Sequence, residues 1–231
     1  LSIRRQRQMC IRDRKQEGLY YINIPILGGI LSSNLMLKIA DIAEKYAWPE
    51  LRLTPHQNLI LVGIKEHLIQ RVLDELRSIG LDINGSNLRW YTVACPSSFC
   101  GKVQEDTKRR ALEVLEYLEK QLGEGLKKLA IRIYVSGCPN ACARHPIADI
   151  GLQAVEVRVD NRAIQGYNLY LGGCLGSNPT VGRLLLKGLD AENLKKALEH
   201  IIRLYMERKR DSETFHEFCS RHSDEELRRL I

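Results

Sequence analysis

The sequence predicts an α+β protein in two parts, a βαββα half-domain followed by an α/β domain with a mixed sheet. Two observations support this prediction: the order in which strand-like and helix-like patterns follow one another, and a change in that order near residue 90. Of the 231 residues, 44% are apolar and 27% are charged, as in a folded globular chain. This composition excludes a largely disordered protein. No stretch approaches the roughly 18 apolar residues of a membrane helix, so we expect no membrane partner.

The first 15 residues are left out of the predicted fold. Residues 1–14 contain five arginines and one aspartate, so they contribute +4 of the net charge of +7 and leave +3 for the other 217 residues. The body of the chain is therefore nearly neutral, and its charge gives no reason to expect a nucleic-acid partner. Because this segment has no helical cap, no apolar periodicity and no starting Met, we interpret residues 1–15 as a non-native or disordered tail rather than a basic arm.

The first predicted domain covers residues 16–85. Its expected elements are a strand at 19–26, a helix from about 33 to 46, strands at 51–54 and 58–64, and a helix at 66–79. The first helix is capped by Ser32, Ser33 or Asn34, and Gly80 ends the second. Two amphipathic helices on one face of such a sheet make most of a ferredoxin-like sandwich, so this part is predicted to be a ferredoxin-like half-domain.

The second predicted domain covers residues 88–231 and alternates strands with helices. Its expected elements are a strand at 91–94, a charged helix at 102–122, strands at 129–135, 151–159 and 164–171, a helix from 190 to about 210, and one or two short helices from 214. The two strands at 151–159 and 164–171 alternate apolar and polar residues around an Asp160-Asn161 turn, which predicts a hairpin.

Cysteines supply the chemistry of this sequence. The seven of them stand at positions 10, 95, 100, 138, 142, 174 and 219. An odd number without a secretion signal argues against a disulfide framework and favours reduced thiols in the cytoplasm. Grouped cysteines in that setting are metal ligands or redox groups more often than staples.

Four of the cysteines form two close pairs, Cys95-x4-Cys100 and Cys138-x3-Cys142. Each pair stands where a predicted strand ends, and the 37 residues between the pairs are enough for a helix and a returning strand. Both loops can then reach the same end of one sheet. Four thiolates gathered there would hold a structural zinc ion or an iron–sulfur cluster, and buried cysteines without a metal are the third interpretation. Gly101 and Gly137 would let the backbone approach the metal centre.

The residues around these pairs resemble the C-terminal half of nitrite and sulfite reductases, which carry a siroheme coupled to a 4Fe-4S cluster. The segments that carry the resemblance are Phe99-Cys100-Gly101, Gly137-Cys138-Pro139-Asn140-Ala141-Cys142, Ala148-Asp149-Ile150-Gly151-Leu152 and Leu171-Gly172-Gly173. Residues 52–58 likewise resemble the Arg-x-Thr-x-x-Gln-Asn element of that family's ferredoxin-like half-domain. The resemblance runs from about residue 17 to residue 231.

The resemblance implies a fold, a site and a reaction. The fold would be a ferredoxin-like half-domain followed by a siroheme and 4Fe-4S domain. The implied cluster ligands are Cys95, Cys100, Cys138 and Cys142, of which Cys142 would also bridge to the siroheme iron as the catalytic thiolate. The implied siroheme contacts are Arg52, Thr54, Gln57, Asn58, Asn140 and Cys142. The family reaction is the six-electron reduction of nitrite to ammonia or of sulfite to sulfide, with electrons from a donor such as ferredoxin.

Two departures from the family pattern stand out. The first two ligands are separated by four residues, where the family usually has five. The chain also carries a single repeat where most of the family has two, so we expect either a fragment that lacks its N-terminal repeat or a short single-repeat enzyme. An electron-transfer module or a structural zinc module without catalysis is the alternative function.

A few other residues receive sequence-based interpretations. His145 is expected to be a polar loop residue near the cofactor, with a proton donor or a zinc ligand as alternatives. Lys102, Arg132 and Arg144 are candidate anion contacts, although Arg132 could instead face solvent. Cys219 is expected in the core, because it follows an aromatic helical pattern.

Overall fold

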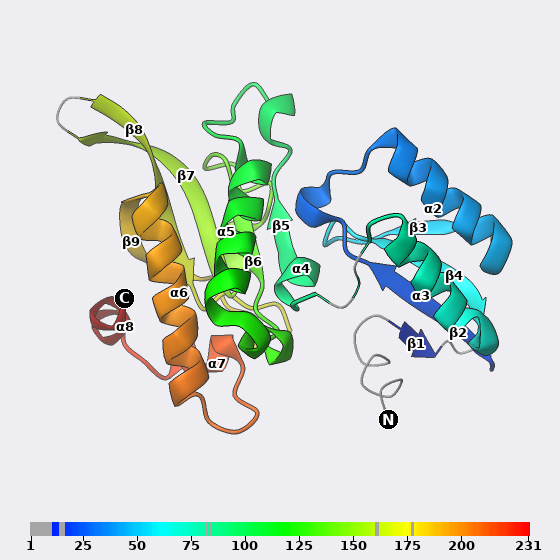
Figure 1. The fold of residues 1–231 in the computed structure, drawn as a ribbon. Helices are drawn as coiled ribbons and strands as arrows, with labels where there is room; N and C mark the ends of the chain where they lie inside the picture. The colour runs from blue at the N-terminus through cyan, green and yellow to red at the C-terminus, as the bar shows by residue number, and fades with distance from the viewer. Residues whose placement is uncertain (1–10, 14–16, 82, 84, 160–161, 177) are drawn as a thin grey trace. The chain divides into compact units, whose positions relative to one another are not determined.

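The computed structural model describes residues 11–13, 17–81, 83, 85–159, 162–176 and 178–231. The chain divides into two compact units, residues 1–85 and 86–231 (Figure 1). The predicted Asp160-Asn161 turn and most of the predicted tail lie outside the described residues. None of the helices in the described part of the chain has the length and apolar character that a membrane crossing requires.

The first unit is a four-stranded antiparallel sheet with two helices. In chain order its elements are β1 (Ile11–Asp13), β2 (Leu19–Ile24), η1 (Leu27–Gly29), α2 (Ser33–Tyr46), β3 (Leu51–Leu53), β4 (Leu59–Lys65), η2 (Glu66–Leu68) and α3 (Ile69–Ser78). The strands are arranged in the order β1-β2-β4-β3. Burial alternates along β2, and α2 packs against both α3 and β4, so the apolar residues of the sheet and helices form one core.

The ends of the two helices follow from single residues. The Ser32 hydroxyl accepts the Leu35 N–H at 3.2 Å, which begins α2 as the sequence predicts. At the end of α3, Gly80 takes a left-handed φ of 87°. This conformation lets the Leu81 N–H reach the Leu76 carbonyl at 3.0 Å and closes the last turn.

Strand β1 corrects the treatment of the N-terminal tail. Residues 11–13 pair antiparallel with β2, with Ile11 opposite Ile22 and Asp13 opposite Tyr20. Their exclusion from the fold together with the rest of residues 1–15 is therefore wrong for these three residues. The physical reason is that without β1 the strand β2 would stand at the edge of the sheet with free N–H and C=O groups, and pairing with them does not require an apolar composition.

The second unit is a five-stranded mixed sheet covered by helices. Its strands, in spatial as well as chain order, are β5 (Thr92–Ala94), β6 (Ile133–Ser136), β7 (Ile150–Val159), β8 (Arg162–Leu171) and β9 (Arg183–Asp190). Its helices are α4 (Leu88–Tyr91), η3 (Ser97–Phe99), α5 (Thr107–Leu122), η4 (Gly123–Lys128), η5 (His145–Ile147), α6 (Ala191–Arg208), α7 (Phe215–Ser220) and α8 (Asp224–Leu230). Strands β5, β6 and β7 are parallel, whereas β8 and β9 are antiparallel to their neighbours. The predicted α+β class with a mixed second sheet is confirmed.

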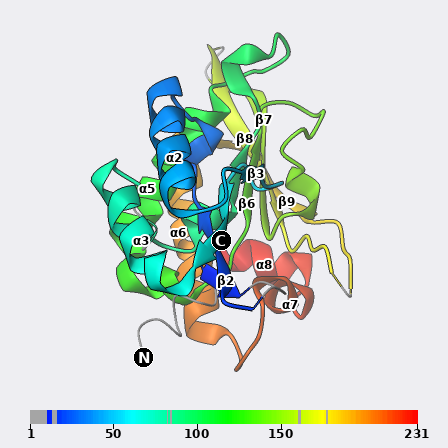
Figure 2. The same ribbon diagram turned by 90° about the vertical axis from the view of Figure 1, so that its right-hand side faces the viewer.

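Helices α5 and α6 lie side by side on one face of this sheet (Figures 1 and 2). Their apolar faces meet the sheet in a large core that includes Leu118, Leu152, Leu169 and Leu198. Burying side chains of this size stabilises the fold by about 1.5–3 kcal/mol each. The core therefore holds the strands rigidly at the edge where the cysteine loops begin.

Three elements of the second unit differ from the sequence-based expectation. The sequence analysis did not predict β9, because three consecutive leucines at 184–186 show no alternation, and only pairing with β8 makes them a strand. Strand β6 begins at Ile133, four residues later than expected. Helix α5 begins at Thr107 rather than Lys102, because the Asp106 carboxylate accepts the Arg109 N–H at 3.2 Å and caps it there.

The C-terminal helices α7 and α8 complete the core. Phe215, Phe218 and Cys219 are buried, which confirms the core position expected for Cys219. Arg183 on β9 ties this segment down, because its guanidinium donates to the His222 carbonyl at 3.0 Å and to Asp224 at 2.8 Å.

Candidate functional site

The four paired cysteines surround one small cavity in the second unit. Cys95 directly follows β5 and Cys138 closely follows β6, and the two strands are parallel neighbours with Ala94 opposite Val135. Carboxyl ends of parallel strands share one edge of the sheet, so both loops start side by side. The cavity has a volume of about 60 Å³. It is lined by Cys95, Pro96, Cys100, Val103, Ser136, Gly137, Cys138, Asn140 and Cys142.

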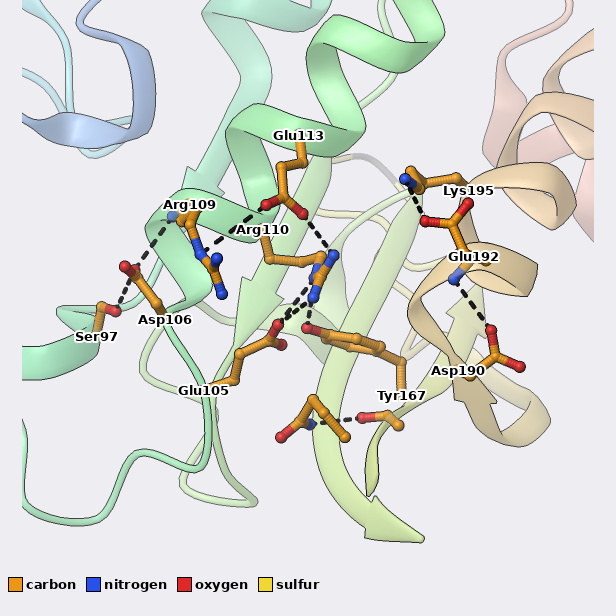
Figure 3. A network of polar contacts seen from close by, with 12 residues as sticks. Ser97, Glu105, Asp106, Arg109, Arg110, Glu113, Tyr167, Asp190, Glu192 and Lys195 are labelled. Atoms are coloured by element: carbon orange, nitrogen blue, oxygen red, sulfur yellow. Dashed lines mark hydrogen bonds and ion pairs between the residues drawn. The ribbon is translucent and has the colours of Figure 1, made fainter. Parts of the chain in front are cut away.

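The first cysteine loop is a single 3-10 turn, η3. The Cys100 N–H donates to the Ser97 carbonyl at 2.9 Å, which brings Cys100 back towards Cys95 in spite of the four-residue spacing. Ser97 has a left-handed φ of 62° and is buried. Its hydroxyl donates to Asp106 at 2.6 Å (Figure 3), and this bond lowers the pKa of the Asp106 carboxyl. The short loop is thereby fastened to the start of α5.

Cys95 is the most enclosed of the four thiols. Its side chain is 7% exposed. The Gly137 N–H donates to its Sγ at 3.3 Å, and the hydroxyl of the fully buried Thr107 lies 3.2 Å from the same atom. Two polar groups from α5 and the second loop therefore meet this sulfur.

The second cysteine loop exposes its last thiol. Ala141 and Arg144 have left-handed φ values of 55° and 61°, and the Arg144 N–H donates to the Ala141 carbonyl at 2.6 Å. These tight turns leave Cys142 and Asn140 exposed, while Cys138 is half-buried. At Gly137 a Cβ would overlap Val103 and lie 3.0 Å from the Thr107 methyl, so only glycine fits.

An ion-pair network positions the start of α5 relative to the sheet (Figure 3). The Arg110 guanidinium donates to Glu105 at 2.8 and 2.6 Å and to the buried Tyr167 hydroxyl of β8 at 3.0 Å. Burial raises the pKa of Glu105, while the bonds from Arg110 act in the opposite direction. Since Thr107 stands between Glu105 and Arg110 in the chain, this network fixes the helical turn that brings Thr107 to Cys95.

The donor set fits an iron–sulfur cluster. All four thiols line one cavity, and among the described residues no group of three or more His, Cys, Asp or Glu side chains is gathered closely enough to hold a single metal ion. A 4Fe-4S cluster takes one thiolate at each of four irons, and it therefore requires ligands distributed around a cavity. The buried Ser136 hydroxyl, which lines the same cavity without a hydrogen-bond partner in the described part of the chain, also fits a group bound there.

The first unit contains a second, larger cavity of about 210 Å³. It is lined by Ile26, Gly29, Leu31, Leu53, Thr54, Gln57, Asn58 and Leu59. The structure thus brings together Thr54, Gln57 and Asn58 of the predicted siroheme contacts. Arg52 does not line this cavity: it is half-exposed and its guanidinium is paired with Glu50 at 2.5 Å.

Backbone bonds hold the polar wall of this second cavity. The Asn58 N–H donates to the Thr54 hydroxyl at 3.1 Å, and the Asn58 side-chain oxygen accepts the Ile26 N–H at 3.1 Å. Gln57 has a left-handed φ of 61°. A Cβ at Gly29 would lie 2.9 Å from the Gln57 side-chain oxygen, so the glycine turn and the amide pack directly together.

Two further sequence-based interpretations are wrong. Arg132 neither faces solvent nor stands ready for an anion, since its guanidinium binds Asp149 at 2.7 and 2.9 Å and the Gly173 carbonyl at 3.2 Å. This ion pair raises the pKa of Arg132. His145 is buried against Tyr170, with 4.9 Å between ring centroids. Burial lowers the pKa of His145 to about 4, so near pH 7 the ring is neutral and cannot serve as an imidazolium acid.

Thr107 and Ser136 are the residues that the sequence analysis missed as site residues. Each is separated from its nearest cysteine by a loop or a glycine, and hydroxyl residues are common in such positions. The sequence indicated these two residues only by their positions: Thr107 comes shortly after the first cysteine pair, and Ser136 directly precedes Gly137. Only the packing of α5 against β5 shows that both hydroxyls face the cysteines.

The fold and the four-thiol cavity together define a domain that can hold an iron–sulfur cluster, and the comparisons with known families agree. The nitrite/sulfite reductase ferredoxin-like half domain matches residues 11–79. The nitrite and sulphite reductase 4Fe-4S domain matches residues 84–231, which is more than half of the chain. The chain therefore belongs to the nitrite and sulfite reductase family.

Individual relatives are moderately similar and much longer. Sulfite reductase (ferredoxin) 2 of Mycolicibacterium paratuberculosis is 30% identical over 94% of this chain and 40% of its own length. Ferredoxin–nitrite reductase of Synechococcus elongatus is 30% identical over 83% of this chain and 37% of its own length. The solved structure of the Mycobacterium tuberculosis NirA protein aligns with a TM-score of 0.87 at 25% identity, over 96% of this chain and 41% of that one. The chain thus spans about 40% of the length of such relatives.

Proposed function

We propose that this chain is the siroheme- and 4Fe-4S-binding part of a larger enzyme that reduces nitrite to ammonia or sulfite to sulfide by six electrons. The observation that supports this proposal most directly is the cavity lined by all four predicted cysteine ligands. Relatives named as sulfite and nitrite reductases support the reaction class. Because these relatives are more than twice as long, we propose that a related N-terminal repeat completes the enzyme.

The two cysteine loops would divide the work of holding the cofactors. The enclosed Cys95 and the half-buried Cys100 and Cys138 would each bind one iron of the cluster. The exposed Cys142 would help to hold the cluster and, because it is accessible, would also be available to siroheme. When bound, the two cofactors supply the iron centres that accept electrons and bind the oxyanion.

The polar wall of the larger cavity would hold the periphery of siroheme. Thr54 and Asn58 are engaged with the backbone, so they rigidify the loop, and Gln57 presents its amide beside Gly29. Leu53, which is 81% exposed, offers an apolar surface to a macrocycle. Arg52 can exchange its exposed Glu50 partner for a siroheme carboxylate, since charge-assisted bonds of this kind are strong. The exposed Asn140 of the second loop would contact siroheme as well.

The proposed partners follow from the chemistry. The substrate would be a small oxyanion, and the electron donor a ferredoxin, as the names of two relatives indicate for those proteins. We propose a cytoplasmic setting, in which free thiols such as those of this chain stay reduced until a metal binds.

Visible and EPR spectra of the anaerobically purified 231-residue chain test the proposal. We expect iron and sulfide in the ratio of a 4Fe-4S cluster, together with siroheme bands in the red after siroheme is supplied. A colourless protein with stoichiometric zinc would overturn the proposal in favour of a structural zinc module. A brown protein that never takes up siroheme would favour an electron-transfer module.

Replacing the bridging ligand tests its assigned role. In Cys142→Ser, we expect the magnetic coupling between siroheme and cluster to disappear and any nitrite or sulfite reduction to fall at least about 100-fold, the upper end of what loss of an outer-shell partner alone costs a metal site. Cys174→Ser is the matched control, because Cys174 is half-buried and does not line the cavity. Unchanged coupling in Cys142→Ser would refute the assignment.

A further inference from the structure

Ser136 carries a buried hydroxyl that the proposed ligand set does not use. It occupies the last position of β6 and is 1% exposed. Its Oγ has no hydrogen-bond partner among the described residues, and the residue lines the cavity of the four cysteines. A buried hydroxyl without a partner is unfavourable and rare in folded proteins. Its position in this cavity indicates that the partner is the group bound there.

A second hydroxyl, that of Thr107 on α5, contacts Cys95, which lines the same cavity. Its Oγ1 lies 3.2 Å from the Cys95 Sγ and 3.2 Å from the Cys95 carbonyl. With Cys95 as a thiol, the sulfur can donate its proton to Oγ1 while the hydroxyl donates to the carbonyl. An iron ligand is a thiolate and has no proton. In the metal-bound state the hydroxyl is therefore the only donor available between the two side-chain atoms.

Gly137 adds a backbone donor on the same side, since its N–H points at the Cys95 Sγ at 3.3 Å. The three donors come from the first turn of α5, the end of β6 and the residue that follows it. Ser136 and Gly137 line the cavity, and the fully buried Thr107 contacts the Cys95 sulfur. In contrast, Cys142 is exposed to solvent.

We propose that the hydroxyls of Ser136 and Thr107, together with the Gly137 N–H, form a hydrogen-bonding shell on the buried side of the cluster and raise its reduction potential. Hydrogen bonds to cluster sulfur stabilise the reduced state most, because that state carries the larger negative charge. The shell makes the cluster a better acceptor for an incoming electron. This inference rests on the proposed function only in taking a cluster to be bound.

An EPR-monitored redox titration of the reconstituted full chain tests the shell. Ser136→Ala and Thr107→Val are expected to shift the midpoint potential of the cluster to more negative values, and the double variant is expected to shift it further than either alone. Ser136→Thr and Thr107→Ser keep a hydroxyl and should stay near the wild-type potential. This rescue by the conservative variants separates hydrogen bonding from packing.

Thr92→Val is the matched control. The Thr92 hydroxyl is also buried without a partner in the described part of the chain, but it stands at the start of β5 and does not line the cavity. Its removal should leave the potential unchanged. A second readout is the coupling of exchangeable deuterons to the reduced cluster in D₂O, which should weaken in Ser136→Ala and Thr107→Val.

The outcomes separate the shell from the proposed function. A normal cluster with an unchanged potential and unchanged deuteron coupling in both hydroxyl-deleted variants would overturn the shell alone. A wild-type chain that assembles no cluster would overturn the proposed function and the shell with it. If Ser136→Ala fails to hold a cluster, Thr107→Val against Thr107→Ser decides the same question.

Discussion

The two cysteine loops begin at the ends of neighbouring parallel strands, yet they hold their thiols in opposite ways. In the first loop, Cys95 is 7% exposed and meets the Gly137 N–H and the Thr107 hydroxyl. In the second loop, the left-handed residue Ala141 turns the chain so that Cys142 is exposed. Both residues are cysteines, so the backbone of each loop, and not the residue type, decides which thiol is buried and which is exposed to a second bound group.

The glycines beside the two loops provide the sharpest test of this comparison. Gly137→Ala should lower the free energy of unfolding of the second unit by about 3 kcal/mol, the upper end for overpacking, because its Cβ would overlap Val103 in a buried site. Gly101→Ala is the control, since a Cβ there meets nothing within 4 Å. Its effect should stay within about 0.5 kcal/mol. Denaturant titration measures both.

Equal effects of the two alanine variants would contradict the comparison. They would mean that both loops approach the cavity equally closely, as the sequence alone suggested for Gly101 and Gly137. Loss of the cluster in Gly137→Ala, with the cluster retained in Gly101→Ala, would instead support the difference between the two loops.

The pH dependence of stability should distinguish the loops next. His145 follows the second loop, and burial lowers its pKa from 6.5 to about 4 in the folded state. Between these two values the unfolded chain binds more protons than the folded chain, so stability rises with pH through this window and falls on acidification. The expected loss between pH 7 and pH 5 is about 2 kcal/mol. Denaturation midpoints at several pH values measure it.

The Asp106 carboxylate, which holds the first loop, should not respond in that window. The lowered pKa of Asp106 contributes stability that is complete above its ordinary value of 3.8 and is lost only as the pH falls below it. The variant His145→Leu, which cannot titrate, should therefore flatten the dependence between pH 7 and pH 5. A slope that persists in this variant would assign the effect to other groups.

Ser97 should give the smallest effect. Ser97→Ala removes the hydrogen bond to Asp106 and should cost about 1 kcal/mol. Glycine is ordinarily less stable than alanine, but at a left-handed φ of 62° it avoids the Cβ clash. We therefore expect Ser97→Gly to be at least as stable as Ser97→Ala in the same denaturant titration, and the reverse order would argue against the strained turn of the first loop.

Much of the fold could be predicted because its determinants are local. Ser32 and Gly80 mark helix ends through bonds to residues within a few positions. Apolar and polar residues alternate in the sequences of the hairpin strands β7 and β8. Helix α6 begins directly after Asp190, because the Asp190 carboxylate caps it. Strand β9 escaped prediction because its pairing with β8, and not its pattern, makes it a strand.

The sequence predicted that the four cysteines would lie together, but it did not predict which residues surround them. Spacing placed the four cysteines at the ends of two strands, and the structure gathers them around one cavity. The solvent-facing interpretation of Arg132 and the proton-donor interpretation of His145 were wrong because their partners lie elsewhere in the chain: Asp149 directly precedes β7, and Tyr170 is on β8. A local pattern does not report which distant group will neutralise or bury a side chain.

The family resemblance, the two-part α+β architecture and the pairing of the cysteines could be read from the amino-acid sequence, since they depend on spacing and periodicity along the chain. The packed fold was needed to show that Cys95 is enclosed, that Cys142 is exposed, that Ser136 lines the cavity and that the Thr107 hydroxyl contacts the Cys95 sulfur. The physical reason is that hydrogen bonding and burial at this site depend on how α5 and β6 pack beside β5, and that packing is settled by core contacts between segments far apart in the chain.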